Sequence, residues 1–229
     1  MRKQMMQIGF RIRDNKDKVS DVISAQFKDM PVANVSDCMA RMTAGGPTLR
    51  PMHESGSLSG PALTVKTRPG DNLLLHKAID MARPGDVIVC DGGGDCTNSL
   101  MGEIMLAYAI TRGVAGFVIN GAIRDLDAFK ERNLPVFAAG VSHRGPYKDG
   151  PGEIGYAIAI DGMVIQPGDL VIGDSDGVLC VPKNSAEEVL KATQAKNEAE
   201  VKQFADIEAG KVNRTWVDDT LKRLGCVME

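Results

Sequence analysis

The chain has 229 residues, 43% of them apolar, which is enough for one large domain or for one domain with a helical appendage. Its 27 Lys and Arg against 30 Asp and Glu give a net charge of −3, so a basic surface that binds nucleic acid is not expected. No apolar run approaches the roughly 18 residues of a membrane span, and the start of the chain lacks the apolar segment of a secretion signal. Five cysteines without a C-x-x-C pair predict reduced thiols and a cytoplasmic protein.

Helical and strand patterns alternate over the first two thirds of the chain. Residues 1–16 are expected to be irregular or to form an edge strand. Apolar residues at helical spacing predict a helix near 17–29 that Pro31 ends, and Ser36 is a candidate cap for a short helix over 37–43. The elements expected next are a strand over 58–67, a helix over 72–82, a strand over 87–90, a helix over 100–112, a strand over 115–119, a helix over 126–132 and a strand over 136–138. This alternation predicts a parallel sheet with crossover helices.

The chain changes character over residues 141–182, where glycines separate short apolar runs. These runs, at 156–160, 163–165, 170–172 and 178–181, predict an antiparallel or mixed sheet layer. Beyond them, Ser185 and Glu188 have the spacing of a capping box, which predicts a long polar helix to about Glu208, and a last helix follows over 215–224. We therefore divide the chain into an α/β domain over 1–184 and a helical extension over 185–229.

Three turns of this chain share one sequence signature. Proline presets φ in such a turn and glycine supplies positive φ, so each turn is expected to be a sharp reversal. The three turns are Pro69-Gly70-Asp71, Pro84-Gly85-Asp86 and Pro167-Gly168-Asp169.

The central stretch 91–125 carries the candidate site. It begins with a glycine turn, continues with a helix that opens over 98–105 and a buried strand, and ends at Arg124-Asp125. The first N–H groups of the helix could bind a carboxylate or phosphate, although the same pattern is typical of an ordinary helix start. Arg124 can clamp a carboxylate and Asp125 can hold a hard cation, although both could form a surface salt bridge, or Asp125 could cap the next helix. Because active sites gather at strand ends in α/β sheets, we place the active site where these two tips face one another.

Other chemistries have weaker support. The glycines after Asp91 fit neither G-x-G-x-x-G nor Walker A spacing, and the acidic residue that a methyltransferase needs after its next strand is missing. His53, His76 and His143 form no zinc motif, and His76 is interpreted as a packed or supporting residue rather than a ligand. An oxygen-rich site would prefer Mg²⁺ or Mn²⁺. No lysine lies within 91–125, so a Schiff-base mechanism is not expected there.

Several motifs in order resemble one known family. Glu103, followed by 20 residues and then Arg124-Asp125, resembles the acidic-x₂₀-Arg-Asp signature of the 4-hydroxy-4-methyl-2-oxoglutarate / 4-carboxy-4-hydroxy-2-oxoadipate aldolases, which are related to the ribonuclease E activity regulator A (RraA). Further motifs that carry the resemblance lie at 58–65, 69–72, 83–87, 121–125, 134–137, 167–169 and 174–178. The resemblance implies a three-layer β/β/α swivelling-domain (RraA-like) fold. It also implies a homotrimer or homohexamer in which the C-terminal extension packs on a neighbouring subunit.

The resemblance implies which residues bind a 2-oxo acid substrate. The α-keto-acid end of that substrate is expected to bind the backbone of four residues at the helix start, Gly102, Glu103, Ile104 and Met105. Arg124 is expected to contact the keto oxygen or the carboxylate.

The resemblance also implies a metal and an acid. Asp125 is expected to anchor a divalent metal, usually Mg²⁺, largely through water molecules. Family members often have Asp where this chain has Glu103, which moves the charge by one methylene. A glutamate on the C-terminal helix of a neighbouring subunit completes the site in the aldolases. Glu200 is the best match for it, with Glu198 next.

The function implied by the resemblance is that of a class II pyruvate aldolase with oxaloacetate decarboxylase side activity. It would cleave 4-hydroxy-4-methyl-2-oxoglutarate or 4-carboxy-4-hydroxy-2-oxoadipate to pyruvate and a second keto acid. The alternative is a non-catalytic, protein-binding regulator of the ribonuclease E inhibitor type. Regulators of that branch end near the position of Pro182, whereas this chain continues for about 45 residues, which favours the enzyme. Loops such as 141–152 are expected to select the C4 substituent.

Overall fold

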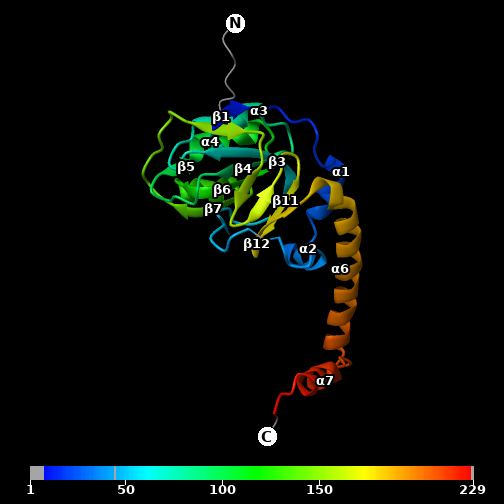
Figure 1. Ribbon diagram of the computed structural model, residues 1–229. Coiled ribbons are helices and arrows are strands. Elements are labelled where there is room, and N and C mark those ends of the chain that lie inside the picture. The colour runs from blue at the N-terminus through cyan, green and yellow to red at the C-terminus, as the bar shows by residue number, and fades with distance from the viewer. Residues whose placement is uncertain (1–7, 44, 228–229) are drawn as a thin grey trace.

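The computed structural model describes residues 8–43 and 45–227. Figure 1 shows a body of strands and helices from which the long helix α6 (Ala186–Glu208) extends, with α7 (Thr215–Arg223) at its far end. Both helices were predicted from the sequence, and the structure confirms them. None of the helices in the described ranges is both long and apolar enough to cross a bilayer. Residues 1–7 of the predicted segment 1–16 lie outside the described part, and β1 (Phe10–Ile12) is an edge strand.

The larger part of the sheet is parallel and confirms the predicted crossover arrangement. Its strands lie in the order β1-β8-β3-β4-β6-β7-β2. The mutually parallel strands are β3 (Leu58–Thr67), β4 (Val87–Asp91), β6 (Gly116–Ile123) and β7 (Val136–Val141). The helices between them are α3 (Leu73–Met81), α4 (Glu103–Thr111) and α5 (Leu126–Arg132). The short strands β2 (Arg50–Pro51) and β8 (Gly152–Ile154), which were not predicted, pair antiparallel with β7 and β3.

A second sheet layer forms within residues 141–182, as predicted. β11 (Leu170–Asp174) pairs antiparallel with β12 (Gly177–Val181), and β9 (Ile158–Ile160) pairs antiparallel with β10 (Met163–Ile165). β3 joins the two layers, because residues 58–61 pair with β11 and residues 62–66 pair with β4. The predicted three-layer β/β/α arrangement is therefore confirmed.

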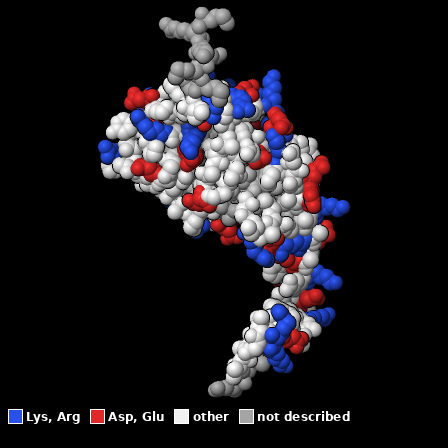
Figure 2. Space-filling model, in the orientation of Figure 1, with Lys and Arg blue, Asp and Glu red and all other residues white. Residues whose placement is uncertain are grey.

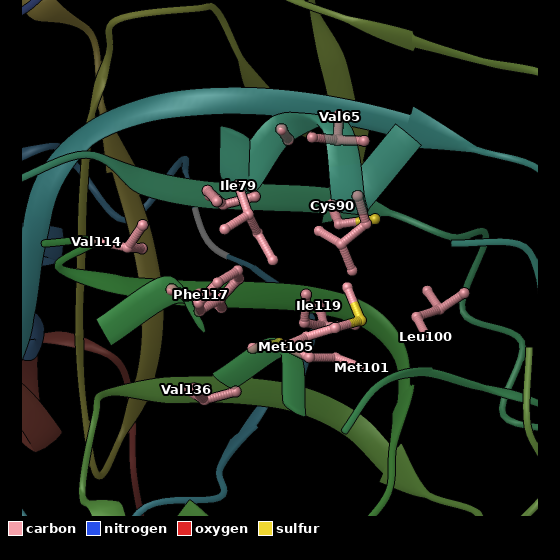
Figure 3. Packing of buried hydrophobic residues seen from close by; sticks show 14 of the residues in the cluster. Val65, Ile79, Cys90, Leu100, Met101, Met105, Val114, Phe117, Ile119 and Val136 are labelled. Carbon is pink, nitrogen blue, oxygen red and sulfur yellow. The ribbon is translucent and has the colours of Figure 1, made fainter. Parts of the chain in front are cut away.

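Alternate residues of the central strands face opposite hydrophobic cores. Figure 3 shows Ile79 of α3 and Met105 of α4 in the same cluster as Phe117 and Ile119 of β6. Val118, between these two strand residues, lies instead in the cluster that separates the two sheet layers. Because both faces of the strands are covered, their sequences are nearly continuous apolar runs. This packing fixes the ends of the strands, from which the candidate site is built.

A third core lies between the second sheet layer and three helices. The helices α1 (Asp21–Phe27), α2 (Val32–Cys38) and α6 cover β11 and β12. α6 buries side chains only in its first turns, at Ala186, Leu190 and Thr193. Farther out, Phe204 is 64% exposed, and Trp216 of α7 is 63% exposed. The domain boundary at 184 and the packing of the extension on a neighbouring subunit stay predictions.

Two predicted helix caps are wrong. α2 begins at Val32, with Pro31 as the cap residue before it, and Ser36 lies inside it. Ser185 ends a 3₁₀ turn (Lys183–Ser185), and its side chain makes no capping hydrogen bond to α6. Its backbone is helical, with φ −107° and ψ −4°, whereas a capping serine is normally extended.

Charged side chains of both signs are interspersed on the visible face of the molecule (Figure 2). Ion pairs form at the surface, such as Arg83 with Asp14 at 2.7 Å. Such exposed pairs contribute little to stability. The absence of a nucleic-acid partner stays a prediction.

Candidate active site

A short strand that the sequence patterns did not reveal brings the predicted site residues together. β5 (Ser99–Met101) replaces the first turn of the predicted helix and pairs in parallel with the end of β6, where Met101 lies beside Ile123. β6 accordingly runs to Ile123 and not to residue 119. The N–H of Arg124 donates to the carbonyl of Met101 at 2.9 Å. The start of α4 and Arg124-Asp125 therefore lie side by side.

Asp125 connects these two tips. Its Oδ2 accepts a hydrogen bond from the N–H of Glu103 at 3.0 Å and lies 3.7 Å from Nε of Arg124. Its backbone is left-handed, with φ 59° and ψ 43°, a conformation that Asp tolerates better than most residues. Although Asp125 directly precedes α5, its carboxylate makes no capping hydrogen bond there and caps α4 instead. The alternative that Asp125 caps the next helix is therefore wrong, and the salt bridge with Arg124 is long and solvent-exposed.

Gly102 allows this close approach. A Cβ at this position would lie 2.7 Å from Oδ2 of Asp125 and 3.0 Å from Nε of Arg124. The φ of Gly102 is −141°, which any residue adopts. Glycine is therefore needed here for space at the start of α4 and not for backbone conformation.

The carboxylate of Glu103 pairs with Arg132 of α5, where Oε1 lies 2.8 Å from Nη2. Both side chains are about half exposed, so the pair is solvated. Glu103 therefore contributes its N–H to Asp125 and its carboxylate to α5. Its predicted catalytic role is not tested by these contacts.

A cavity of about 170 Å³ lies at the start of α4 and contains four of the predicted residues. Gly102, Ile104, Met105 and Arg124 line it. The first intrahelical bond of α4 joins Leu106 N–H to the Gly102 carbonyl at 3.1 Å, so the N–H groups of Ile104 and Met105 precede it. A helix start with such N–H groups attracts a carboxylate, through both hydrogen bonding and the helix dipole.

The cavity is also lined by residues that sequence reasoning did not assign to the site. Asn72 and His76 come from the start of α3, and Lys148 comes from the segment 142–150, inside the loop that was expected to select the substrate. Burial, and then the positive charge of Lys148, lower the pKa of His76 below its usual value. Asn72 Nδ2 donates to the Leu100 carbonyl at 2.9 Å, while its Oδ1 is buried without a partner among the described residues. The cavity is thus lined by two cationic side chains, Arg124 and Lys148.

Lys148 also qualifies the argument against a Schiff base. That argument considered only residues 91–125, whereas this lysine reaches the cavity from outside them. Lys148 is exposed to solvent, unlike the desolvated lysine that amine catalysis needs.

Asp125 is suited to hold a divalent cation through water. Its side chain is 45% exposed, and only one of its oxygens accepts the Glu103 hydrogen bond. Mg²⁺ typically binds one or two carboxylates, keeps several water molecules and accepts substrate oxygens. The described residues contain no group of three or more His, Cys, Asp or Glu side chains that could enclose a metal. The donor set therefore fits a hydrated Mg²⁺ or Mn²⁺ and not a structural zinc.

Glu200 lies on α6 and is bound within its own chain. It accepts a hydrogen bond from Asn34 Nδ2 at 2.6 Å and pairs with Lys196 at 3.0 Å. These two contacts, Asn34 first, lower the pKa of Glu200. Neither Glu200 nor Glu198 lines the cavity of its own subunit. Their contribution to a neighbouring site stays a prediction.

A larger and more open depression of about 480 Å³ lies elsewhere on the body. Arg13, Tyr156 and Lys183 are among its lining residues, and none of the predicted site residues is. We therefore place the candidate site in the smaller cavity, which the helix start and Arg124 line and beside which Asp125 binds the Glu103 N–H.

The sequence matches one protein family over most of its length. Residues 32–180 match the family model described as RraA-like, Aldolase/RraA. Over 184 residues the chain is 43% identical to a protein of Halalkalibacterium halodurans that carries the name "Putative 4-hydroxy-4-methyl-2-oxoglutarate aldolase", and this match covers 79% of the chain and 88% of that protein.

Solved structures share the fold. An uncharacterized protein from Pseudomonas syringae pv. tomato superposes with a TM-score of 0.77 at 27% identity, covering 86% of this chain and 96% of that one. The RNA-processing inhibitor RraA from Thermus thermophilis superposes with a TM-score of 0.63 at 26% identity, covering 67% of this chain and 93% of that one. With a family model spanning more than half of its residues and a relative of 43% identity, the chain belongs to the RraA-like (Aldolase/RraA) family.

Proposed function

We propose that this chain is a divalent-metal-dependent pyruvate aldolase. Its substrate would be 4-hydroxy-4-methyl-2-oxoglutarate or 4-carboxy-4-hydroxy-2-oxoadipate, cleaved to pyruvate and a second keto acid. The observation that carries the proposal is that the α4 start and Arg124 line one cavity, while Asp125 binds the first N–H of α4 beside it. The aldolase name of the relative at 43% identity supports the same reaction class.

The α-keto-acid end of the substrate binds at the start of α4. Its carboxylate accepts hydrogen bonds from the N–H groups of Ile104 and Met105, and the guanidinium of Arg124 lies beside its keto oxygen. Asp125 cannot bind that carboxylate itself, and instead orders the helix start through the Glu103 N–H.

Cleavage of the C3–C4 bond leaves negative charge on the keto oxygen of the departing pyruvate enolate. Arg124 stabilises this charge, because a fixed cation next to a developing oxyanion lowers the barrier. A divalent ion held by Asp125 would act as a Lewis acid on the same oxygen. A carboxylate-held water removes the proton of the C4 hydroxyl, with Glu103 and the neighbour's glutamate as candidate holders. Decarboxylation of oxaloacetate passes through the same enolate, which predicts that side activity.

Lys148 and His76 are placed to receive the other end of the substrate. Both line the cavity together with the α4 start, and the substrate carries a second carboxylate. The low pKa of His76 keeps its ring neutral near neutral pH, so Lys148 supplies the charge and His76 a hydrogen bond. This arrangement favours dicarboxylic over monocarboxylic oxo acids.

The proposed active form is a homotrimer or homohexamer in which α6 and α7 pack on a neighbouring subunit. The exposed apolar side chains of this extension, Val201, Phe204 and Trp216, would be covered by that contact. Glu200, or Glu198 in its place, would then complete the neighbouring site. A cytoplasmic location is part of the proposal.

The second candidate is a non-catalytic regulator that binds a ribonuclease. The likeness to the Thermus RraA structure favours it, but that match covers 67% of this chain and 93% of the other. About a third of this chain therefore has no counterpart there. An extension of this kind is what the enzyme needs for a shared site, so we favour the aldolase.

The deciding experiment measures pyruvate release from oxaloacetate and from 4-hydroxy-4-methyl-2-oxoglutarate, with Mg²⁺ and with EDTA. The proposal expects Mg²⁺-dependent release from both. Release from oxaloacetate alone would keep the metal site and reject the aldolase. No release from either would favour the regulator, and binding to a ribonuclease E fragment would then be measured directly.

A further inference from the structure

The three Pro-Gly-Asp turns have the same backbone. In each, the N–H of the aspartate donates to the carbonyl three residues earlier, at 3.0 Å for Asp71, 3.0 Å for Asp86 and 3.1 Å for Asp169. The glycines have φ values of 75°, 88° and 86°. All three aspartates are buried, with 0%, 7% and 4% of their surface exposed. A difference between the turns must therefore come from what their carboxylates bind.

In two of the turns the carboxylate closes its own turn. Asp86 Oδ2 accepts from the N–H of Arg83 at 2.9 Å, and Asp169 Oδ2 accepts from the N–H of Gln166 at 2.9 Å. Both donors stand three residues before the aspartate. These two carboxylates thus stabilise the reversal itself, while their other oxygens bind Lys18 Nζ at 3.2 Å in Asp86 and the N–H of Lys183 at 3.0 Å in Asp169.

In the first turn the carboxylate accepts from the Arg68 side chain at 3.3 Å, but the main-chain N–H groups it binds lie in a distant loop and at the start of α3. The N–H of Arg68, the equivalent donor, goes to the Pro151 carbonyl at 3.3 Å. Asp71 Oδ2 accepts from the N–H groups of Asp149 at 2.7 Å and Gly150 at 2.9 Å. Asp71 Oδ1 accepts from the N–H of Leu73 at 3.0 Å, at the start of α3. One buried carboxylate therefore joins α3 to the segment 142–150.

This connection encloses Lys148 on both sides. Before it, Tyr147 donates its N–H to the Gly70 carbonyl at 2.8 Å and accepts from the N–H of Asn72 at 3.0 Å. After it, Asp149 and Gly150 bind the Asp71 carboxylate. Lys148 thus lies between two anchored residues, and it lines the candidate cavity.

We propose that Asp71 is a positioning residue that holds segment 142–150 against the cavity and so places Lys148 for substrate binding. The part concerning substrate rests on the proposed function. Hydrogen bonds from N–H groups to a carboxylate are stronger than those between neutral groups. A buried N–H that loses its acceptor destabilises the folded structure around it. An amide at position 71 offers one acceptor oxygen in place of two, so it cannot serve both the loop and α3.

The test compares Asp71→Asn with Asp86→Asn, a buried aspartate of the same motif outside the cavity. Hydrogen exchange of peptides covering 146–151 is measured by mass spectrometry. Asp71→Asn should speed exchange at Asp149 and Gly150 by roughly 10- to 100-fold, and Asp86→Asn should not change it. Since the one amide oxygen can stay with the loop or with α3, exchange of Leu73 is measured too, and unchanged exchange at all three N–H groups in Asp71→Asn overturns the anchoring. If Asp71→Asn fails to fold, hydrogen exchange of the wild-type protein tests the anchoring. Exchange of the Asp149 and Gly150 amides at the rate of an unstructured peptide would overturn the anchoring.

Kinetics then test the link to Lys148. Asp71→Asn should raise KM for the oxo-acid substrate about tenfold while kcat stays within about threefold, since it acts on binding. In the Lys148→Ala background the same change should add little, because both act through one side chain. The positioning role would be rejected if the effects of Asp71→Asn and Lys148→Ala on KM multiplied in the double variant. It would also be rejected if Asp86→Asn raised KM as much as Asp71→Asn. Wild-type protein without turnover would refute the proposed function, while the exchange result would still judge the anchoring.

Discussion

Asp125→Asn removes one negative charge beside the cavity and changes little else. The amide oxygen of Asn can accept the hydrogen bond from the Glu103 N–H, which Asp125 now receives at 3.0 Å. Asn also tolerates the left-handed backbone, with φ 59°. The lost ion pair with Arg124 has a separation of 3.7 Å between half-exposed side chains, so it contributes at most about 1 kcal/mol. For a chain of this size the melting temperature should fall by less than about 4 °C.

Asp125→Ala changes the structure as well as the charge. It removes the hydrogen bond to Glu103, worth about 1 kcal/mol. It also places a residue without a polar side chain in the left-handed region, which costs about 1 kcal/mol more. The combined loss of about 2 kcal/mol should lower the melting temperature by roughly 4–8 °C. The pair of variants therefore separates the role of the charge from the role of the local fold.

If Asp125 holds the metal, both variants should lose Mg²⁺-dependent pyruvate release by about 100-fold or more. The assay is pyruvate release against Mg²⁺ concentration, beside thermal unfolding of the same samples. Asp127→Asn, an exposed carboxylate on α5, is the matched control and should behave like wild type. Full Mg²⁺ activation of Asp125→Asn would place the metal elsewhere, and activity lost only in Asp125→Ala would mean that the effect is structural.

Three further predictions concern single side chains. Arg124→Ala should lower turnover by about 100-fold or more with an unchanged oligomer on size exclusion, and near-normal turnover would refute its role. The pKa of His76 is lowered by burial and by Lys148, so the unfolded chain takes up its proton first. The free energy of unfolding should therefore be highest above the usual His pKa of about 6.5 and should fall as pH falls below it. His76→Gln should make the free energy of unfolding, measured by denaturant titration, depend less on pH. An unchanged pH dependence contradicts the lowered pKa of His76. Glu200→Gln should lose activity, whereas Glu198→Gln should keep it. Mixing Glu200→Gln subunits with Arg124→Ala subunits should restore part of the activity, because some sites then combine two intact contributions. No restoration argues against a site shared between subunits.

Elements with clear boundary residues could be predicted from the sequence closely. β3 matches its predicted range of 58–67, and α5 matches its predicted range of 126–132. In both, turn residues flank a pattern of one period, so local preference and tertiary packing agree. The predicted pair of sheet layers followed from the same alternation and from the glycines after residue 141.

Local patterns failed where a tertiary contact decides the structure. Ser99-Leu100-Met101 precedes good helix formers and continues their pattern, but pairing with the end of β6 makes it a strand. Gly102, which the sequence placed inside the helix, marks the actual start. The helix or strand preference of a single residue carries no information about a pairing strand more than twenty positions away.

The candidate site could be predicted only in part, again because tertiary contacts complete it. Arg124, Asp125 and the α4 start are close in sequence, so one motif contained them. His76 and Lys148 come from two separate segments, and only the contact between α3 and the loop 142–150 brings them to the cavity. The orientation of Glu103 toward Arg132 likewise depends on how α4 packs beside α5.

The loop 142–150 is attached to the body largely through its own main chain. Arg144, Gly145 and Tyr147 offer carbonyl groups to Ser99, Asn98 and Asn72, while Asp149 and Gly150 offer N–H groups to Asp71. Main-chain groups are the same in nearly every amino acid, proline excepted for the N–H. Side chains such as Lys148 can therefore be exchanged during evolution while the loop keeps its path. Substrate preference can diverge among descendants of this protein by point substitution, without any redesign of the scaffold.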